Sequence, residues 1–232
     1  MKEQKRHSDI FKIDGIGVDL SRFHTCTAAE KNELRRDLGC SENDFIITVV
    51  AELNKNKNQI MLIRAVPKLK LIISELKILL IGKETLPTVR EFVEKSGLSD
   101  TVQFLGYRYD VEKLTMISDI AFSASFREGL PVNIIEAMAC GIPVVCSDNR
   151  GHRSLIKDKE TGFLFSPKSE KEMADAIVLL YKNPALRLEM GSRNSEEAKK
   201  YSVDIAVQKM AGIYGDLISS KNEKQGGGTE VE

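Results

Sequence analysis

Tryptophan is absent from this chain of 232 residues, which has only five tyrosines and nine phenylalanines. Single-stranded nucleic acids bind where bases stack on aromatic side chains beside basic groups, and the sequence has no basic stripe with interleaved aromatics. Charge of one sign is not in excess either, because 34 Lys and Arg residues balance 34 Asp and Glu residues. These features argue against a nucleic-acid partner, so an anionic ligand must be held by local groups.

Cysteine is scarce, and none of the four cysteines forms a C-x-x-C pair. Two of them stand in apolar runs, where Cys commonly acts as a small core residue. The first residues, MKEQKRHSDIF, are charged rather than apolar, and no apolar run approaches the roughly 18 residues of a membrane span. The sequence predicts a reduced, soluble, cytoplasmic protein. Its basic start leaves peripheral membrane contact open as the alternative to a solvated tail.

The standard phosphate and metal motifs are also missing. No G-x-x-x-x-G-K-[ST] loop occurs, and DGIGVDLS is not the dinucleotide G-x-G-x-x-G. Because no D-x-D pair occurs and the three histidines lack ligand spacing, we predict metal-independent ligand binding and no cofactor. His152 is expected to have a surface or capping role, and a place near the bound ligand is the alternative.

From Phe45 onward, short continuous apolar runs alternate with amphipathic stretches, which is typical of buried parallel strands joined by helical crossovers. Five strands are predicted within residues 45–53, 77–84, 101–106, 119–125 and 143–148. Helices are predicted at 59–73, 87–96, 111–118, 131–140, 170–182, 185–201 and 203–219. The pattern predicts an α/β fold, a Rossmann-like open parallel sheet with helices on both faces. We expect an N-terminal segment or linker at 1–24, the domain at 25–220 and a disordered tail at 221–232.

The stretch FREGLPVNIIEAMACGIPVV, between the fourth and fifth predicted strands, carries the clearest chemistry. Glu128 and Gly129 fall in a turn at the carboxyl edge of the sheet, and Pro131 is suited to the first helical position. A helix N-terminus offers free N–H groups and partial positive charge to a diphosphate. The expected backbone contacts are those of Leu130, Val132 and Asn133.

Glu128 and Glu136 are separated by seven residues, which puts one in the turn and the other inside the helix. A carboxylate has two acceptor oxygens, so Glu136 has the right chemistry to take both hydroxyls of a ribose diol. From spacing alone, the alternative is that Glu136 faces solvent and Glu128 is an ordinary turn residue.

The same stretch resembles the Glu-(seven residues)-Glu signature of the retaining glycosyltransferases with the GT-B fold, known as group 1 or family four. Further matching segments are GIGVDLSRF, VVAELNKNKNQIMLIRA, LLIGKE, VQFLGYRYDV and SDNRGHRSLIKDKETGFLF. The resemblance covers roughly residues 14 to 219, in the family's order. It implies one half of a GT-B fold, the half that binds the nucleotide sugar.

The resemblance implies a role for each matching residue. Glu128 would lie beside the donor sugar and Lys57 would neutralise the diphosphate, and these two form the predicted catalytic pair. Glu136 would bind the ribose. Further predicted donor contacts are Gly129, Leu130, Val132, Asn133, Gly82, Gly106, Tyr107 and Arg108, of which the last three would hold the base.

One position departs from the family's pattern. The family often has an arginine shortly before the lysine, and Glu52 stands there in this chain. A carboxylate repels a diphosphate, so Glu52 must point away or a nearby cation must compensate. The candidates for compensation are Lys55, Lys83, Arg127 and Arg150.

The implied activity is hexosyl transfer from a nucleoside diphosphate sugar, with UDP favoured over GDP or ADP, in polysaccharide synthesis. The acceptor would be a sugar, lipid-linked sugar or polysaccharide held by an N-terminal domain, and too few residues precede GIGVD to build one. The isolated chain is therefore expected to bind donor without efficient transfer. A sugar-nucleotide epimerase and a non-catalytic nucleotide-sugar-binding module are the alternatives.

Overall fold

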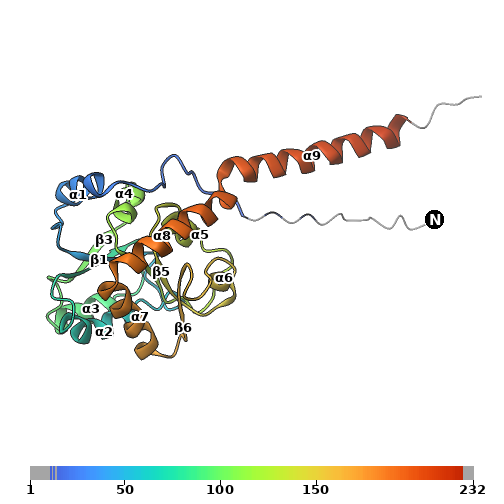
Figure 1. The fold of residues 1–232 in the computed structure, drawn as a ribbon. Coiled ribbons are helices and arrows are strands. Elements are labelled where there is room, and N and C mark those ends of the chain that lie inside the picture. Colours follow the sequence, from blue (N-terminus) through green and yellow to red (C-terminus); the bar gives the residue numbers. More distant parts are fainter. Residues whose placement is uncertain (1–10, 12, 14, 227–232) are drawn as a thin grey trace, which may run out of the picture.

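The computed structural model describes residues 11, 13 and 15–226 and forms an α/β fold around one six-stranded sheet (Figure 1). All neighbouring strands pair in parallel. The strands are β1 (Phe45–Val50), β2 (Leu76–Ile81), β3 (Val102–Gly106), β4 (Ile120–Ser123), β5 (Val144–Ser147) and β6 (Gly162–Phe165). This confirms the predicted Rossmann-like fold class.

The strand order is β3-β2-β1-β4-β5-β6, so the chain reverses its direction of travel across the sheet between β1 and β4. Open parallel sheets bind ligands at this point, because the loops after the two strands turn to opposite faces and leave a crevice at the carboxyl edge. The loops that leave β1 and β4 carry Lys57 and Glu128. The topology therefore brings together two segments about seventy residues apart in the sequence.

Helices cover both faces of the sheet. One core cluster joins α2, α3 and α7 to the sheet, and a second joins α5, α4 and the segment before the domain. Figure 1 shows α2, α3 and α7 on one side of the strands, with α1 and α4 on the other. The helices are α1 (Ala28–Asp37), α2 (Ile60–Lys70), α3 (Thr88–Lys95), α4 (Val111–Met116), α5 (Val132–Ala139), α6 (Arg150–Arg153), α7 (Glu170–Lys182), α8 (Pro184–Ala198) and α9 (Val203–Gly226), with the short 3₁₀ helix η1 (Lys199–Tyr201) before α9.

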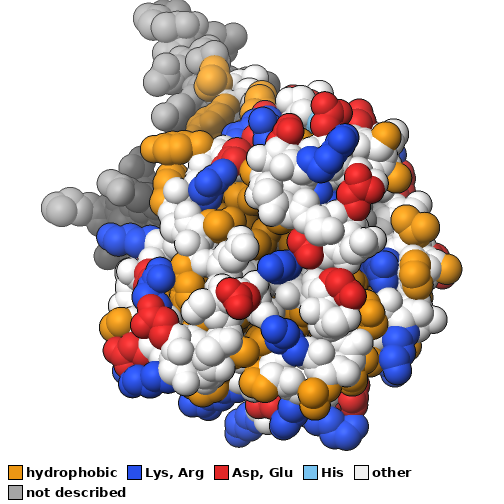
Figure 2. All heavy atoms as spheres, turned by 90° about the vertical axis from the view of Figure 1, so that its left-hand side faces the viewer, with side chains coloured by type: hydrophobic (Ala, Val, Ile, Leu, Met, Phe, Trp, Pro, Cys, Tyr) orange, Lys and Arg blue, Asp and Glu red, His pale blue; other side chains and the backbone are white. Residues whose placement is uncertain are grey.

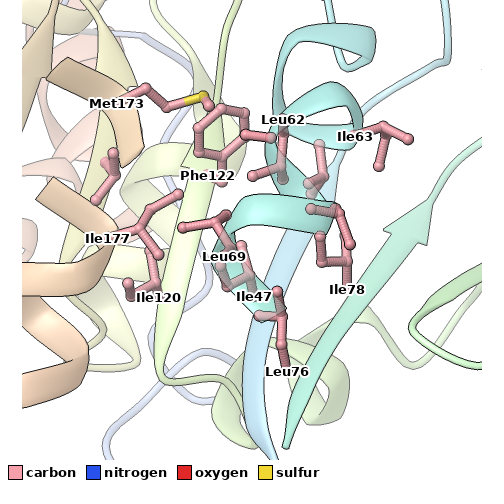
Figure 3. Close-up of a cluster of buried hydrophobic side chains, with 14 of the residues drawn as sticks. Ile47, Leu62, Ile63, Leu69, Leu76, Ile78, Ile120, Phe122, Met173 and Ile177 are labelled. Carbon is pink, nitrogen blue, oxygen red and sulfur yellow. The ribbon is translucent and has the colours of Figure 1, made fainter. Parts of the chain in front are cut away.

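The largest core cluster lies between β1, β2, β4 and the two helices α2 and α7 (Figure 3). Ile47 and Ile78 project from adjacent strands toward Leu62 and Leu69 of α2, and all four side chains are inaccessible to solvent or nearly so. A buried Leu or Ile side chain contributes about 1.5–3 kcal/mol of transfer free energy. This core fixes the strands whose carboxyl ends carry the candidate site.

Three elements, β6, α1 and the four-residue helix α6, were not predicted from the sequence. β6 has only four residues at the edge of the sheet, and its run ETGFLF is too short and too polar at its start to stand out. Helix α1 begins with a capping box in which the Thr27 side chain accepts from Glu30 N and the Glu30 carboxylate accepts from Thr27 N. The Thr-x-x-Glu spacing that marks this start is visible in the sequence.

The segment expected to be a linker packs against the domain from Gly15 onward. Val18 and Phe23 are buried in the cluster that includes α5. Val18 N donates to Tyr201 O at 2.8 Å, and Val203 N donates to Val18 O at 3.0 Å. At the other end, α9 projects away from the body (Figure 1). It continues through residues 221–226 of the segment expected to be disordered, and residues 227–232 lie outside the described part.

Charge is mixed on the surface. Figure 2 shows one face on which basic and acidic side chains alternate without a large region of one sign, as the balanced composition predicts. Within residues 11, 13 and 15–226, no helix is long and apolar enough to cross a membrane. All four cysteines are free thiols, and burial raises the pKa of each of them.

Candidate functional site

The candidate site lies where the turns after β1 and β4 meet. Asn56 joins the two turns, because its backbone oxygen accepts from Phe126 N at 2.9 Å and its side chain donates to Arg127 O at 3.0 Å. These bonds hold the Lys57 loop against the turn that contains Glu128. Two strands that are neighbours in space, but not in sequence, therefore present one continuous surface.

Lys57 and Glu128, the predicted catalytic pair, are in direct contact. Lys57 Nζ lies 2.6 Å from Glu128 Oε1, with the two side chains 24% and 13% exposed. The lysine is positioned by its own loop, since Asn54 Oδ1 accepts from Lys57 N at 3.0 Å and Asn58 adopts a left-handed conformation with φ of 51°. Asn tolerates this conformation better than most residues, which suits the tight turn after Lys57.

The start of α5 lies beside this ion pair. Pro131 is the N-cap residue, with φ of −76° and ψ of 99°, so the helix begins at Val132, one residue later than predicted. The first N–H groups of a helix have no partner within it, and those of Val132 and Asn133 are available to an anion, whereas Ile134 N donates to Pro131 O at 3.1 Å. Gly129 is exposed, and a Cβ atom there would meet nothing within 4 Å. Leu130 and Val132 are half-buried around it.

Asn133 is held at the topological switch point by its side chain. Its Nδ2 donates to Val50 O, the last carbonyl of β1, at 2.9 Å. The amide therefore ties the first turn of α5 to the end of the neighbouring strand. This adds a structural function to the backbone contact predicted for Asn133.

Glu136 is half-buried on α5, on the side that faces α4 and the segment before the domain. Burial raises the pKa of Glu136, the positive charge of Arg22 opposes that rise, and the negative charge of Glu112 adds to it. The carboxylate makes no hydrogen bond or ion pair with another residue of the described chain. Among the described residues it is thus a half-buried carboxylate without a partner, and not a fully solvated helix residue.

A cleft of about 450 Å³ opens at the ends of β1, β2 and β3. The cleft is lined by Val50, Ala51, Glu52, Ile81, Gly82, Lys83, Tyr107, Arg108 and Val111. Three of the predicted donor contacts line it, and Gly106, with φ of 64°, begins the turn that carries two of them. Its size falls within the range of small-molecule pockets.

Gly82 is required where it stands. Its φ is 146°, and a Cβ atom there would lie 2.2 Å from Ala51 O, so the ends of β1 and β2 approach too closely for a side chain.

The turn after β3 is also built from specific contacts, because Arg108 Nε and Nη2 donate to the two oxygens of Asp110 at 2.8 and 2.6 Å. These bonds occupy one edge of the guanidinium and leave its faces for stacking on a ring. Tyr107 beside it is 73% exposed.

Glu52 lines the same cleft as Lys83. Its carboxylate accepts from Asn54 Nδ2 at 3.3 Å, and its carbonyl accepts from the buried Gln59 side chain at 2.9 Å. Of the four cations considered as compensation, Lys83 is the one that lines this cleft. Glu52 is therefore part of the wall of the cleft, and Lys83, which follows the end of β2, lines the same cleft.

The region around His152 was not predicted correctly. His152 is fully buried, so a surface role is wrong, and the helix cap is the neighbouring Asn149, whose Oδ1 accepts from His152 N at 3.1 Å. The imidazole Nδ1 lies 2.7 Å from Ser147 O. A Cβ atom at Gly151 would lie 2.6 Å from Glu128 Cβ, so α6 packs tightly behind the Glu128 turn. Helix α6 therefore supports the turn that carries Glu128. This support depends on tertiary packing and could not be predicted from the sequence.

No group of three or more His, Cys, Asp or Glu side chains with the spacing of a metal site occurs within the described residues. Metal independence stays a prediction, because the structure contains no ligand that would test it.

Comparison with known proteins places this geometry in a family. The family model of glycosyl transferases group 1 matches residues 30–200. EpsD of Bacillus subtilis (strain 168), which carries a glycosyltransferase name, is 39% identical over 204 residues, 88% of this chain and 54% of that protein. An Escherichia coli UDP-Gal:alpha-D-GlcNAc-diphosphoundecaprenol alpha-1,3-galactosyltransferase is 26% identical over 92% of this chain and 56% of its own length. The chain thus spans about half the length of these relatives.

Solved structures agree with the fold. Anabaena Alr3699/HepE, crystallised with UDP and glucose, superposes with a TM-score of 0.78 at 25% identity, over 86% of this chain and 55% of that one. The C-terminal domain of LpcC, a group 1 glycosyl transferase from Francisella tularensis, superposes with a TM-score of 0.71 at 23% identity, over 80% of this chain and 99% of that domain. By sequence and by fold, this chain belongs to the glycosyl transferases group 1.

Proposed function

We propose that the chain is the donor-binding half of a glycosyltransferase that uses a UDP-sugar. The observation that carries the proposal is the meeting of Lys57 and Glu128 at the open N-terminus of α5, beside the cleft at the ends of β1, β2 and β3. A lysine and a helix N-terminus provide positive potential for a diphosphate. The cleft is large enough for a base, and the half-buried Glu136 carboxylate on α5 is a free acceptor for the ribose.

Each part of the donor then has a partner. The diphosphate binds Lys57 and the amides that begin α5, the ribose hydroxyls donate to Glu136, and the base enters the cleft beside Tyr107 and Arg108. The sugar extends from the diphosphate toward Glu128. UDP is favoured because HepE was crystallised with UDP-glucose and the Escherichia coli relative is named for a UDP-galactose donor.

The reaction that fits these groups is transfer with retention at the anomeric carbon. The bond between that carbon and the diphosphate oxygen breaks, and Lys57 and the helix amides stabilise the charge that develops on the leaving group. An acceptor hydroxyl forms the new bond on the same face of the sugar, and its proton passes to the departing diphosphate oxygen. Glu128 positions the sugar, since no side chain here is arranged as a nucleophile with its base. The acceptor, a sugar or lipid-linked sugar, would be held by a separate domain, and this chain alone binds donor without efficient transfer.

Calorimetric titration with UDP, GDP and ADP tests donor binding. UDP should bind most tightly, and Glu136→Ala should weaken it by about 10–100-fold, because bonds to a charged acceptor contribute about 1.5–3 kcal/mol. Glu189→Ala, which removes an exposed glutamate on α8, is the matched control and should leave affinity unchanged. A folded sample that ignores all three nucleotides at millimolar concentration would exclude the proposal.

The stereochemistry needs a protein that also holds the acceptor. With this domain joined to an acceptor domain, NMR of the product should show the same anomeric configuration as the donor sugar. An inverted product would exclude the retaining mechanism while leaving the donor site intact.

A further inference from the structure

The segment before the domain, residues 15–23, runs along the edge of the nucleotide site. It is held firmly, because Val18 bonds to the backbone on both sides of Ser202, and Phe23 is buried beside α5. Within it, Phe23 N donates to Asp19 O at 3.0 Å and Ser21 N donates to Asp19 Oδ1 at 2.9 Å. The side chain of Arg22 therefore projects from a rigid turn.

Arg22 contacts the wall of the cleft from outside. Its Nη2 donates to Glu112 Oε2 at 2.8 Å and to Tyr109 O at 3.3 Å. Tyr109 follows directly on Tyr107 and Arg108, and Val111 beside Glu112 lines the cleft. One guanidinium thus joins the segment before the domain to the turn that forms the base side of the site.

The same guanidinium acts on Glu136. The charges that perturb this carboxylate are those of Arg22, which favours its ionised form, and Glu112, which disfavours it. The thiol of Cys140, one turn further along α5, is kept protonated by its own raised pKa and adds no charge. The segment before the domain, α4 and α5 therefore bring one positive and two negative groups together, and Val111, next to Glu112, lines the cleft.

We propose that Arg22 is a positioning residue of the nucleotide site, which fixes the turn after β3 against the Glu136 end of α5 and thereby sets the spacing of the base and ribose subsites. This inference rests on the proposed function, because it assumes that a nucleotide occupies the cleft. A purely structural ion pair between Arg22, whose side chain is 54% exposed, and Glu112 would affect unfolding slightly and leave ligand binding unchanged.

The test compares two ligands that differ only in the part Arg22 is said to organise. UDP carries base, ribose and diphosphate, whereas inorganic pyrophosphate carries the last alone. In Arg22→Gln the affinity for UDP should fall by about 3–10-fold, less than the loss of a direct charged contact because Arg22 acts through other residues, while that for pyrophosphate stays within about twofold. Arg193→Gln removes a comparable exposed arginine, paired with Glu189 at 2.6 Å on α8, and should change neither.

The pH dependence of UDP affinity gives a second test, in which Arg22→Gln and Glu112→Gln should shift the profile in opposite directions. Ribose hydroxyls donate to the ionised carboxylate, so UDP affinity is present above the pKa of Glu136 and is lost as pH falls through it. Arg22→Gln should move this loss to higher pH than in the unaltered protein, and Glu112→Gln should move it to lower pH. The phosphate of UDP titrates near pH 6 but does so equally for every variant.

The outcomes separate the two hypotheses. If the unaltered protein binds UDP but Arg22→Gln leaves both its affinity and its acid profile unchanged, the role of Arg22 is refuted and the donor site stands. Equal weakening of UDP and pyrophosphate also refutes it, because the effect is then not confined to base and ribose. If Arg22→Gln melts early, Arg22→Lys keeps the charge and should retain the acid profile. Failure of the unaltered protein to bind UDP would remove the proposed function itself.

Discussion

Replacement of Lys57 and of Glu128 should change UDP affinity in opposite directions. In the ligand-free protein the ammonium is already paired with the carboxylate at 2.6 Å, so a diphosphate must compete for it. Two unit charges about 4 Å apart interact by about 4 kcal/mol at an effective dielectric constant near 20. A diphosphate that binds Lys57 must weaken the existing pair with Glu128, so the net binding energy is only part of the energy of the new contact.

Lys57→Met should therefore weaken UDP binding by about 10–100-fold, or about 1.4–2.8 kcal/mol. Glu128→Gln should strengthen UDP binding by about 2–10-fold, because the amide neither holds the lysine as strongly nor repels the diphosphate. The same variant should lose the additional affinity that a UDP-sugar has over UDP, since the carboxylate is assigned to the sugar.

The measurement is isothermal titration with UDP and with UDP-sugars, on both single variants and on the double variant. In a double-mutant cycle, the two changes should couple, because the residues share one interaction. Lys68→Met, which breaks an exposed pair with Glu170 at 3.3 Å between α2 and α7, is the control and should leave affinity unchanged. The reasoning fails if Glu128→Gln weakens UDP binding as much as Lys57→Met does, because the carboxylate would then support diphosphate binding by positioning Lys57 and would not compete with it.

Two further outcomes concern stability. Gly82→Ala should lower the melting temperature by roughly 5–10 °C, because its Cβ would lie 2.2 Å from Ala51 O and overpacking costs about 1–3 kcal/mol. The control is Gly39→Ala, where φ is also positive, at 72°, but a Cβ atom would meet nothing within 4 Å. This control has backbone strain without a packing clash and should cost less stability. Burial lowers the pKa of His152, so the unfolded chain binds more protons than the folded one and stability should fall as pH drops from about 6.5. His152→Gln should flatten that loss in denaturant titrations, and an unchanged slope would show that the imidazole is charged when folded.

Much of the fold could be predicted from the sequence because its cause is local. The run FIITVV is continuous and β-branched, which is typical of a strand buried on both faces, and the structure places it at the centre of the sheet as β1. The helix around Glu136 ends at Ala139, and Gly141, two residues later, has a φ of 69°, the left-handed conformation that glycine adopts readily after a helix. By contrast, the short β6 has no pattern of its own and is a strand only because β5 offers it a partner.

The site divides in the same way. The turn chemistry of Glu128 and Gly129 and the start of the helix at Pro131 or next to it could be predicted, because each depends on neighbours in the chain. The partner of Lys57, the close approach of Gly151 to Glu128 and the effect of Arg22 on Glu136 could not. These contacts join residues between 23 and 114 positions apart, and no local pattern encodes such pairs.

The sequence by itself determined the alternation of buried strands and helices, the open helix N-terminus and the residue types available to a donor, because these follow from periodicity and turn chemistry. Only the tertiary structure decided which charges meet. The reversal of strand order between β1 and β4 set Lys57 against Glu128, and the packing of the segment before the domain set Arg22 beside Glu112. The physical reason is that an ion pair depends on distance in space, which is set by the close packing of the sheet and its helices and not by separation along the chain.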